Sequence, residues 1–192
     1  METNMATCIY FVRHAESEYL EGAERSRGLT ERGKQDALKV RDLLMEEQID
    51  VLVSSPYRRA IETIQHLADA LNKEVIIEED LRERKLSGTD FDLYQFYEAK
   101  RRVLEEPSFS FPGGESTFEV QQRAIPILTR LLHEYSGKNI AVATHGDIMT
   151  VMMNYYDKKY DYHFWENTTM PDIYRLQFDE KQNLARVTRL WK

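Results

Sequence analysis

Basic side chains follow three short, largely apolar segments of this sequence, at once or within three residues. Arg13 and His14 follow the run CIYFV, Arg58 and Arg59 follow DVLVSS after two residues, and His145 follows NIAVAT. Guanidinium and imidazole groups share a preference for one kind of ligand, a phosphate or a carboxylate. The arginine pair is informative because it occupies the first turn of a predicted helix, where the helix dipole disfavours cations. The three groups together favour an anion-binding pocket.

The elements that would position these residues follow from the spacing of apolar side chains. Strand-sized apolar runs occupy 8–12, 50–55, 74–77 and 139–144, and helical spacing occurs over 31–47, 56–71, 90–106, 117–135 and 145–156. The segments 172–178 and 184–190 alternate with a period of two around the polar turn DEKQN, which predicts an antiparallel hairpin. The order predicts an α/β fold with a mostly parallel central sheet, helices on both faces and a C-terminal hairpin.

Details of two helices refine this scheme. Ser116 and Glu119 match an S-x-x-E capping box, so the fourth helix is expected to begin near Thr117. Pro126 within it is expected to cause a kink, because proline removes a backbone donor. Open parallel sheets bind ligands at the carboxyl ends of their strands, so the basic groups are expected to converge there.

Each residue also has a simpler explanation. Arg13 and His14 could mark only the point where a strand leaves the core, and His145 could be a surface histidine at a helix start. One of the two arginines, Arg58 or Arg59, is expected to pair with an acid on its own helix, such as Glu62. The joint occurrence of all three groups favours the shared pocket.

Length and composition restrict the class of protein. The 192 residues suit a single domain, 1–192, and 42% hydrophobic residues are typical of a folded globular chain. The net charge of -7 argues against nucleic-acid binding. The single Cys8, expected to be a buried small side chain, and the polar start METNMAT predict a cytoplasmic protein, and no apolar run reaches membrane-spanning length.

Six motifs occur in one order along the chain: RHAES, LTERG, SSPYRRAIET, LRER, PGGES and THGD. In that order the sequence resembles the histidine phosphatase superfamily, the phosphoglycerate-mutase-like proteins, over about Cys8 to Val151. The resemblance implies the fold of that family. It also implies a catalytic set with a phosphohistidine intermediate on one histidine, and these residues are His14 as nucleophile, Arg13, Arg59 and His145 around the phosphate, and Glu83 as proton donor. Gly146 and Ser17 are implied as further phosphate-binding residues.

The chemistry explains why these residue types belong together. Phosphoryl transfer passes through a charged, loosely bonded transition state, so positioned cations supply most of the catalysis. A neutral imidazole attacks phosphorus, while a carboxylic acid protonates the departing oxygen and, as carboxylate, later activates water. The expected enzyme is therefore a metal-independent phosphomonoesterase without a cofactor, acting on a small-molecule phosphate ester.

The sequence departs from the family pattern at three places. Ala15 stands where glycine is usual, and Leu20 stands where many members carry a phosphate-binding asparagine. The segment LSGTDFD lacks the tryptophan-glutamate-glycine that commonly follows the LRE stretch, which leaves substrate recognition open. Tyr94 and its neighbours Phe96 and Tyr97 could line a substrate pocket or simply pack on the sheet. The lysines and acids in YYDKKYDY are expected to form a solvated loop.

Three other functions remain open at this level. A phosphoglycerate-type mutase would use the same residues, although the chain has little room for the inserted segments that mutases carry. A non-catalytic phosphate-binding module would retain Arg13, Arg59 and His145 without turnover. A metal-dependent hydrolase could use His14, His145 and Asp147, but adjacent arginines are poor neighbours for a metal cation. Oligomeric state and physiological substrate are not encoded in any motif.

Overall fold

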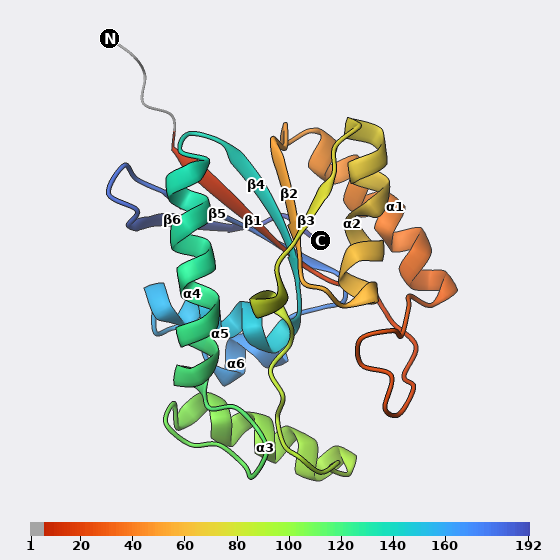
Figure 1. The fold of residues 1–192 in the computed structure, drawn as a ribbon, viewed down its shortest axis with the longest axis vertical. Coiled ribbons are helices and arrows are strands. Elements are labelled where there is room, and N and C mark those ends of the chain that lie inside the picture. The colour runs from red at the N-terminus through yellow and green to blue at the C-terminus, as the bar shows by residue number, and fades with distance from the viewer. Residues whose placement is uncertain (1–5) are drawn as a thin grey trace.

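The computed structural model describes residues 6–192 as one six-stranded sheet with helices around it (Figure 1). The strands are β1 (Thr7–Arg13), β2 (Val51–Ser54), β3 (Val75–Ile77), β4 (Asn139–Thr144), β5 (Asp172–Phe178) and β6 (Leu184–Arg189). The helices are α1 (Glu31–Met45), α2 (Arg58–Leu71), α3 (Leu93–Glu105), α4 (Thr117–Glu134), α5 (Gly146–Tyr156) and α6 (Tyr162–Glu166), with a single 3-10 turn, η1 (Glu79–Leu81).

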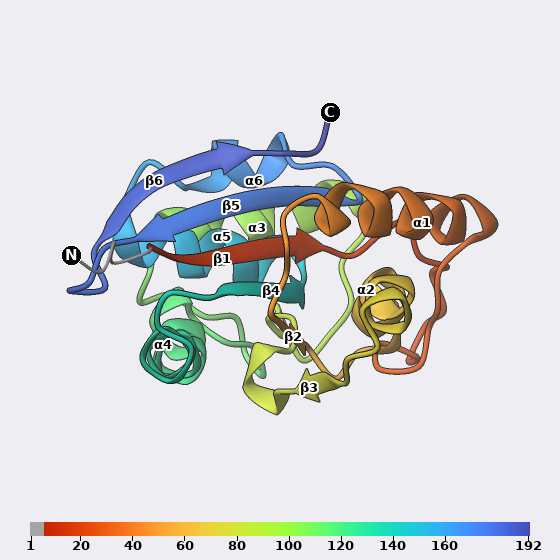
Figure 2. The ribbon, with the colours of Figure 1, turned by 90° about the horizontal axis from the view of Figure 1, so that it is seen from above.

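The strand order across the sheet is β3-β2-β4-β1-β5-β6, as the view from above shows (Figure 2). The pairs β1–β4, β2–β4 and β2–β3 are parallel, whereas β5 runs antiparallel to β1 and pairs with β6 as a hairpin. The predicted α/β class, the mostly parallel sheet and the C-terminal hairpin are confirmed.

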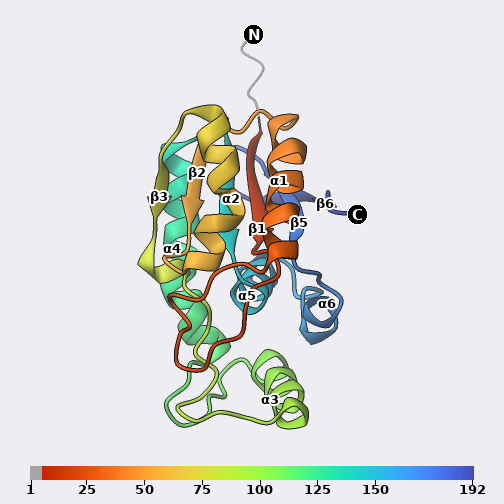
Figure 3. The same cartoon turned by 90° about the vertical axis from the view of Figure 1, so that its right-hand side faces the viewer.

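Side chains of β1 point alternately into two apolar cores. Ile9 and Phe11 belong to the core beneath α4 and α5, while Tyr10 and Val12 belong to the core beneath α1 and α2. Figure 3 shows α1 and α2 in front of the sheet with α4 behind it, so both faces are covered. A strand buried on both faces must be apolar throughout, which explains the unbroken run CIYFV.

The carboxyl ends of the parallel strands, the loop after β1 and helix α3 lie at one end of the molecule (Figure 1). The LTERG motif closes this loop: Thr30 caps α1 through Gly33 N and donates its hydroxyl to the Glu16 carboxylate at 2.8 Å. A side chain at Gly33 would lie 2.1 Å from the Glu16 carbonyl oxygen, so only glycine permits this approach.

Several boundaries differ from the sequence prediction. Helix α1 ends at Met45, and α3 begins only at Leu93 because Asp92 and Gln95 form a capping box there. The box predicted at Ser116 and Glu119 is present, and α4 runs on through Pro126.

The lysines and acids after α5 were predicted to form a solvated loop, and Lys158, Lys159 and Asp161 are exposed between α5 and α6. Tyr160 and Tyr162 in this segment are buried, and the 3-10 turn η1 and helix α6 were not predicted. The rings of Tyr160 and Phe164 lie 4.9 Å apart, and Phe164 contacts Tyr174 of the sheet. The segment YYDKKYDY thus buries two of its aromatic side chains while its lysines stay exposed. Cys8 is buried, as expected. No helix within 6–192 combines the length and apolar character that crossing a bilayer requires.

Candidate active site

His14 directly follows β1, and its imidazole is buried and fixed in one tautomer. Nδ1 lies 2.7 Å from the carbonyl oxygen of Ala15, so Nδ1 carries the hydrogen, and Nε2 accepts a hydrogen bond from Arg59 Nε at 3.3 Å. The Ala15 amide donates to the Thr63 hydroxyl at 3.0 Å, which anchors the peptide that orients the ring. Burial and then the nearby Arg59 guanidinium hold the pKa of His14 well below its usual range. The ring is therefore neutral, with its Nε2 lone pair directed at a cation.

Arg59 reaches this imidazole from the first turn of α2. Its side chain is almost completely buried, and its guanidinium lies over the Tyr57 ring, 4.9 Å from the ring centroid. The adjacent Arg58 points outward and pairs with Glu62 at 2.5 Å. The sequence prediction that one arginine of the pair serves the helix and the other the pocket agrees with these contacts.

Arg13 lies on the opposite side, packed on the start of α5. Its Nη1 donates to the Thr168 hydroxyl at 2.6 Å, and a Cβ on Gly146 would stand 2.7 Å from its guanidinium carbon. Gly146 therefore leaves room for this guanidinium, and its predicted contact with phosphate stays a prediction.

His145 caps α5 at the end of β4 and faces His14, with the two ring centroids 5.3 Å apart. Its Nε2 pairs with the Ser55 hydroxyl at 2.7 Å, and its ring also meets Tyr57 edge-on at 5.0 Å. Burial holds the pKa of His145 well below its usual range, and the charge of Arg59 acts in the same direction. Ser55 thus orients the second histidine.

A third arginine, Arg27, reaches the pocket from the loop after β1, and the sequence analysis missed it. Its Nη1 donates to the Ser17 hydroxyl at 2.5 Å, and its charge is among the causes that lower the pKa of both pocket histidines, after burial. Ser17, whose predicted contact with phosphate stays a prediction, accepts this hydrogen bond from Arg27. The loop charges in ERSRG were the available signal, but sequence spacing does not tell which of its two arginines turns inward.

The carboxylate of Glu24 bridges two of these cations. Its Oε2 accepts from Arg59 Nη2 at 2.9 Å, and its Oε1 lies 3.5 Å from Arg27 Nη2. Its backbone carbonyl also accepts from Arg59 Nη1 at 2.6 Å. An oxyanion is therefore already accommodated between the two guanidinium groups.

Unsatisfied polar groups gather at the same place. Within 6–192, five buried side-chain nitrogen or oxygen atoms have no hydrogen-bond partner, and four of them belong to residues at this end of the sheet. These four are Arg13 Nε, Arg27 Nε, Thr144 Oγ1 and His145 Nδ1. Because buried polar atoms are nearly always paired, such a concentration of potential donors indicates a site built for a polar, anionic ligand.

Glu83 approaches from the segment after η1 and docks on the start of α5. Its Oε1 accepts from the amides of Arg84 and Ile148, both at 2.9 Å, and its Oε2 accepts from the amide of Asp147 at 3.2 Å. Burial lowers the pKa of Arg13, and the Glu83 carboxylate is the strongest charge opposing that shift. The carboxylate therefore lies close to the pocket, on the side of Arg13.

The sequence-predicted residues thus meet at one end of the sheet. His14 contacts both Arg59 and His145, and Arg13 and Glu83 lie at the start of α5. Ser17 and Gly146 contact two of the arginines. Leu20, at the position of the missing asparagine, is half exposed. Within 6–192, no three His, Cys, Asp or Glu side chains are grouped so as to hold a metal ion.

Comparison with known proteins identifies the family. The sequence profile of the histidine phosphatase superfamily (branch 1) matches residues 9–189. The chain belongs to this superfamily. It is 34% identical over 155 residues to phosphoserine phosphatase 1 of Hydrogenobacter thermophilus, covering 75% of this chain and 73% of that protein. It is also 29% identical over 204 residues to the 2,3-bisphosphoglycerate-dependent phosphoglycerate mutase of Mesorhizobium japonicum, covering 91% and 95%.

Solved structures share the fold. The mycobacterial glucosyl-3-phosphoglycerate phosphatase superposes with a TM-score of 0.77 at 20% identity, covering 97% of this chain and 98% of that one. The predicted family membership and fold are therefore confirmed. Several relatives of the chain are named as phosphatases of small phosphorylated molecules.

Proposed function

We propose that this protein is a phosphomonoesterase that hydrolyses a phosphorylated small molecule through a phosphohistidine on His14. The observation that carries the proposal is the neutral His14 imidazole, whose Nδ1 is bound to a carbonyl oxygen and whose Nε2 lone pair faces the buried Arg59 guanidinium. Relatives named as phosphatases support the same activity. A phosphate placed against Nε2 would meet Arg59, Arg13 and the unpartnered Nδ1 of His145.

In the first step, the Nε2 lone pair of His14 forms a bond to phosphorus as the bond from phosphorus to the ester oxygen breaks. Negative charge on the transferring group is stabilised by the guanidinium groups of Arg13 and Arg59, already oriented by their contacts. A protonated Glu83 gives its proton to the leaving oxygen, which departs as a neutral alcohol.

In the second step, water attacks the phosphorus of the phosphohistidine. Glu83, now a carboxylate, accepts a proton from this water, and the bond from phosphorus to Nε2 breaks. Inorganic phosphate leaves and His14 returns to its neutral form. One difficult displacement is thus divided into two easier ones on the same nitrogen.

The proposed mechanism needs no metal ion, because the arginines carry the charge stabilisation that a metal would otherwise supply. Arg13, Arg27 and Arg59 converge on one pocket, and each of them repels a metal cation. A chelator such as EDTA should therefore leave the rate unchanged.

A phosphoglycerate-type mutase is the second candidate, favoured by the mutase relative that the chain matches over nearly its whole length. The first step would be the same, and the phosphoryl group would then pass to a hydroxyl of the substrate instead of to water. The two activities separate in one assay, because a mutase returns an isomeric phosphate ester and a phosphatase releases inorganic phosphate.

The deciding experiment is metal-free hydrolysis of p-nitrophenyl phosphate by the wild type and the His14→Ala variant. We expect turnover by the wild type, loss of at least about a thousandfold in the variant, and a phosphoryl adduct that is labile to acid and stable to alkali. His66→Ala, an exposed histidine on α2, is the matched control and should retain full activity. Phosphate binding without turnover or adduct would instead identify a binding module.

A further inference from the structure

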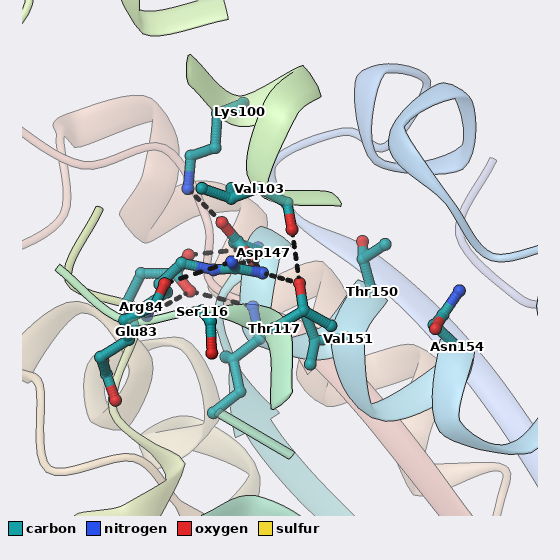
Figure 4. Close-up of polar contacts among 12 residues, drawn as sticks. Glu83, Arg84, Lys100, Val103, Ser116, Thr117, Asp147, Thr150, Val151 and Asn154 are labelled. Atoms are coloured by element: carbon teal, nitrogen blue, oxygen red, sulfur yellow. Dashed lines mark hydrogen bonds and ion pairs between the residues drawn. The ribbon is translucent and has the colours of Figure 1, made fainter. Parts of the chain in front are cut away.

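A buried cluster of charges lies beside the pocket and takes no part in the mechanism above. The Asp147 side chain is fully buried between two cations: Arg84 approaches Oδ1 to 2.8 Å and Lys100 approaches Oδ2 to 2.5 Å (Figure 4). Arg84 is also fully buried, and Lys100 nearly so. Burial raises the pKa of Asp147, but the two cations outweigh it and hold this pKa below its usual range, so the carboxylate is charged.

The backbone of the same two residues holds Glu83. The amides of Arg84 and Asp147 donate to opposite oxygens of the Glu83 carboxylate, at 2.9 and 3.2 Å, while their side chains bind each other. These contacts close a ring from Glu83 through Arg84 and Asp147 back to Glu83. The position of the carboxylate on the first turn of α5 is therefore set by the side-chain pair beneath it.

Arg84 is itself fixed from several directions. Its Nη2 donates to the Thr117 hydroxyl at 2.9 Å at the start of α4, and that hydroxyl donates to the Val103 carbonyl of α3 at 2.7 Å (Figure 4). Lys100, also on α3, lies 5.5 Å from the Phe96 ring centroid and 5.7 Å from that of Trp165. The Arg84–Asp147 pair thus joins the Glu83 segment to α3, α4 and α5.

A buried ion pair of this kind is a poor source of net stability, because desolvating the charges offsets much of their attraction. It does impose a strict geometry, since a planar guanidinium and a carboxylate meet in a limited range of orientations. The acid of the proposed mechanism needs such precision, because proton transfer requires hydrogen-bond distance to the leaving oxygen.

We propose that Arg84 and Asp147 are positioning residues for the proton-transfer step, which hold the Glu83 carboxyl group in line with the leaving oxygen. This inference rests on the proposed function. Neither residue is placed at the reacting atoms, so a substitution of either one must change the rate through Glu83. The size of that change must therefore depend on how much the leaving group needs a proton.

The test compares two substrates that differ only in the leaving group. Nitrophenolate departs readily without a proton, whereas the phenol of phenyl phosphate, with a pKa of about 10 like that of tyrosine, needs one. We expect Asp147→Asn and the charge-conserving Arg84→Lys each to raise the ratio of kcat/KM for p-nitrophenyl phosphate to that for phenyl phosphate by about tenfold or more. Glu83→Gln sets the upper limit of this ratio.

The matched control is Arg175→Lys, which makes the same exchange in the Arg175–Glu47 ion pair between β5 and the end of α1. It should leave the ratio unchanged. Circular dichroism and Tm confirm that each variant is folded, and if Asp147→Asn fails to fold, Arg84→Lys alone decides.

Three results would overturn the inference. An equal loss on both substrates in a folded variant would make the pair merely structural, and unchanged rates on both would remove any role. An unchanged ratio in Glu83→Gln would exclude Glu83 as the acid and the inference with it. A wild type without turnover or phosphohistidine refutes the proposed function itself, and that outcome is visible before any variant of the pair is measured.

Discussion

The two sides of the candidate site are built differently. The phosphate side consists of side chains at or just after the ends of β1, β2 and β4 and the start of α2, and His14, Arg59 and His145 on it are all buried. The leaving-group side combines Glu83 with the long connection from η1 to α4, where Leu93 and Tyr94 are 74% and 78% exposed. The sheet thus fixes the residues proposed for phosphoryl transfer, whereas much of the connection is exposed and lies outside the sheet.

The difference has a physical basis in backbone hydrogen bonding. Residues at strand ends inherit the rigidity of the sheet, and the His14 amide still donates to the Thr144 carbonyl at 3.0 Å, continuing the ladder beyond β1. The connection carries only α3 as regular structure, attached by the Lys100–Asp147 contact and by Phe96 on Trp165. Substitutions on the two sides should therefore produce different kinetic signatures.

The largest effects after loss of His14 itself are expected on the phosphate side. Arg59→Ala and His145→Ala should each lower kcat/KM by about a hundredfold or more, because each removes a donor to the transferring phosphoryl group. The loss should be the same for p-nitrophenyl phosphate and phenyl phosphate, since neither residue protonates the leaving group. Arg58→Ala, one residue away and paired with Glu62, is the control and should stay near wild-type activity. A larger loss of kcat/KM on phenyl phosphate than on p-nitrophenyl phosphate would mean that these residues also assist the leaving group, and would contradict the division of the site into two sides.

On the leaving-group side, Glu83→Gln should discriminate between substrates. We expect a loss of about a hundredfold on phenyl phosphate and far less on p-nitrophenyl phosphate, measured as kcat under saturating conditions. Asp80→Asn, an exposed acid close by that pairs with Arg82, should change neither rate. Equal losses on both substrates would place the acid elsewhere.

The pH dependence of kcat/KM tests the electrostatics of the phosphate side. A histidine with the ordinary pKa of 6.5 would be mostly protonated at pH 5.5 and would lose about tenfold in nucleophilic form. Burial and Arg59 lower the pKa of His14 well below that value, so its neutral form persists as the pH falls. After correction for the dianionic fraction of the substrate, kcat/KM at pH 5.5 should stay within about twofold of its value at pH 7. A tenfold fall would show that His14 titrates normally.

The smallest expected effect concerns Glu24, whose carboxylate forms an ion pair with Arg59 from the exposed loop after β1. Glu24→Gln should tighten inhibition by orthovanadate by about fivefold at most, because exposed ion pairs contribute about 1 kcal/mol or less. The reason is competition, since the Glu24 carboxylate and an oxyanion bind the same guanidinium. Glu21→Gln, in the same loop, is the control and should leave the inhibition constant unchanged. Weaker inhibition in Glu24→Gln would mean that Glu24 positions Arg59 for the phosphate.

Much of the architecture was predictable because it depends on local pattern. Apolar runs of strand length, the capping box at Ser116 and the alternating hairpin at 172–190 each specify an element within a few residues. The two misplaced elements have different causes. Helix α6 depends on tertiary packing, since Phe164 contacts Tyr174 of the sheet, whereas the start of α3 is set by a local capping box at Asp92 and Gln95 that the helical spacing alone did not reveal.

The sequence by itself determined the α/β order and placed His14, His145 and the pair Arg58 and Arg59 at one edge, because strand ends in a parallel sheet must meet there. The choice of Arg59 within the pair came from the family resemblance. Three features were decided only by the tertiary structure. Arg27 is the loop arginine that turns inward, Ser55 orients His145, and the amides of Arg84 and Asp147 bind the Glu83 carboxylate. Those contacts join residues far apart in the chain, 63 positions for Arg84 and Asp147. No local sequence pattern predicts these contacts, because the two partners come within hydrogen-bond distance only when the chain has folded.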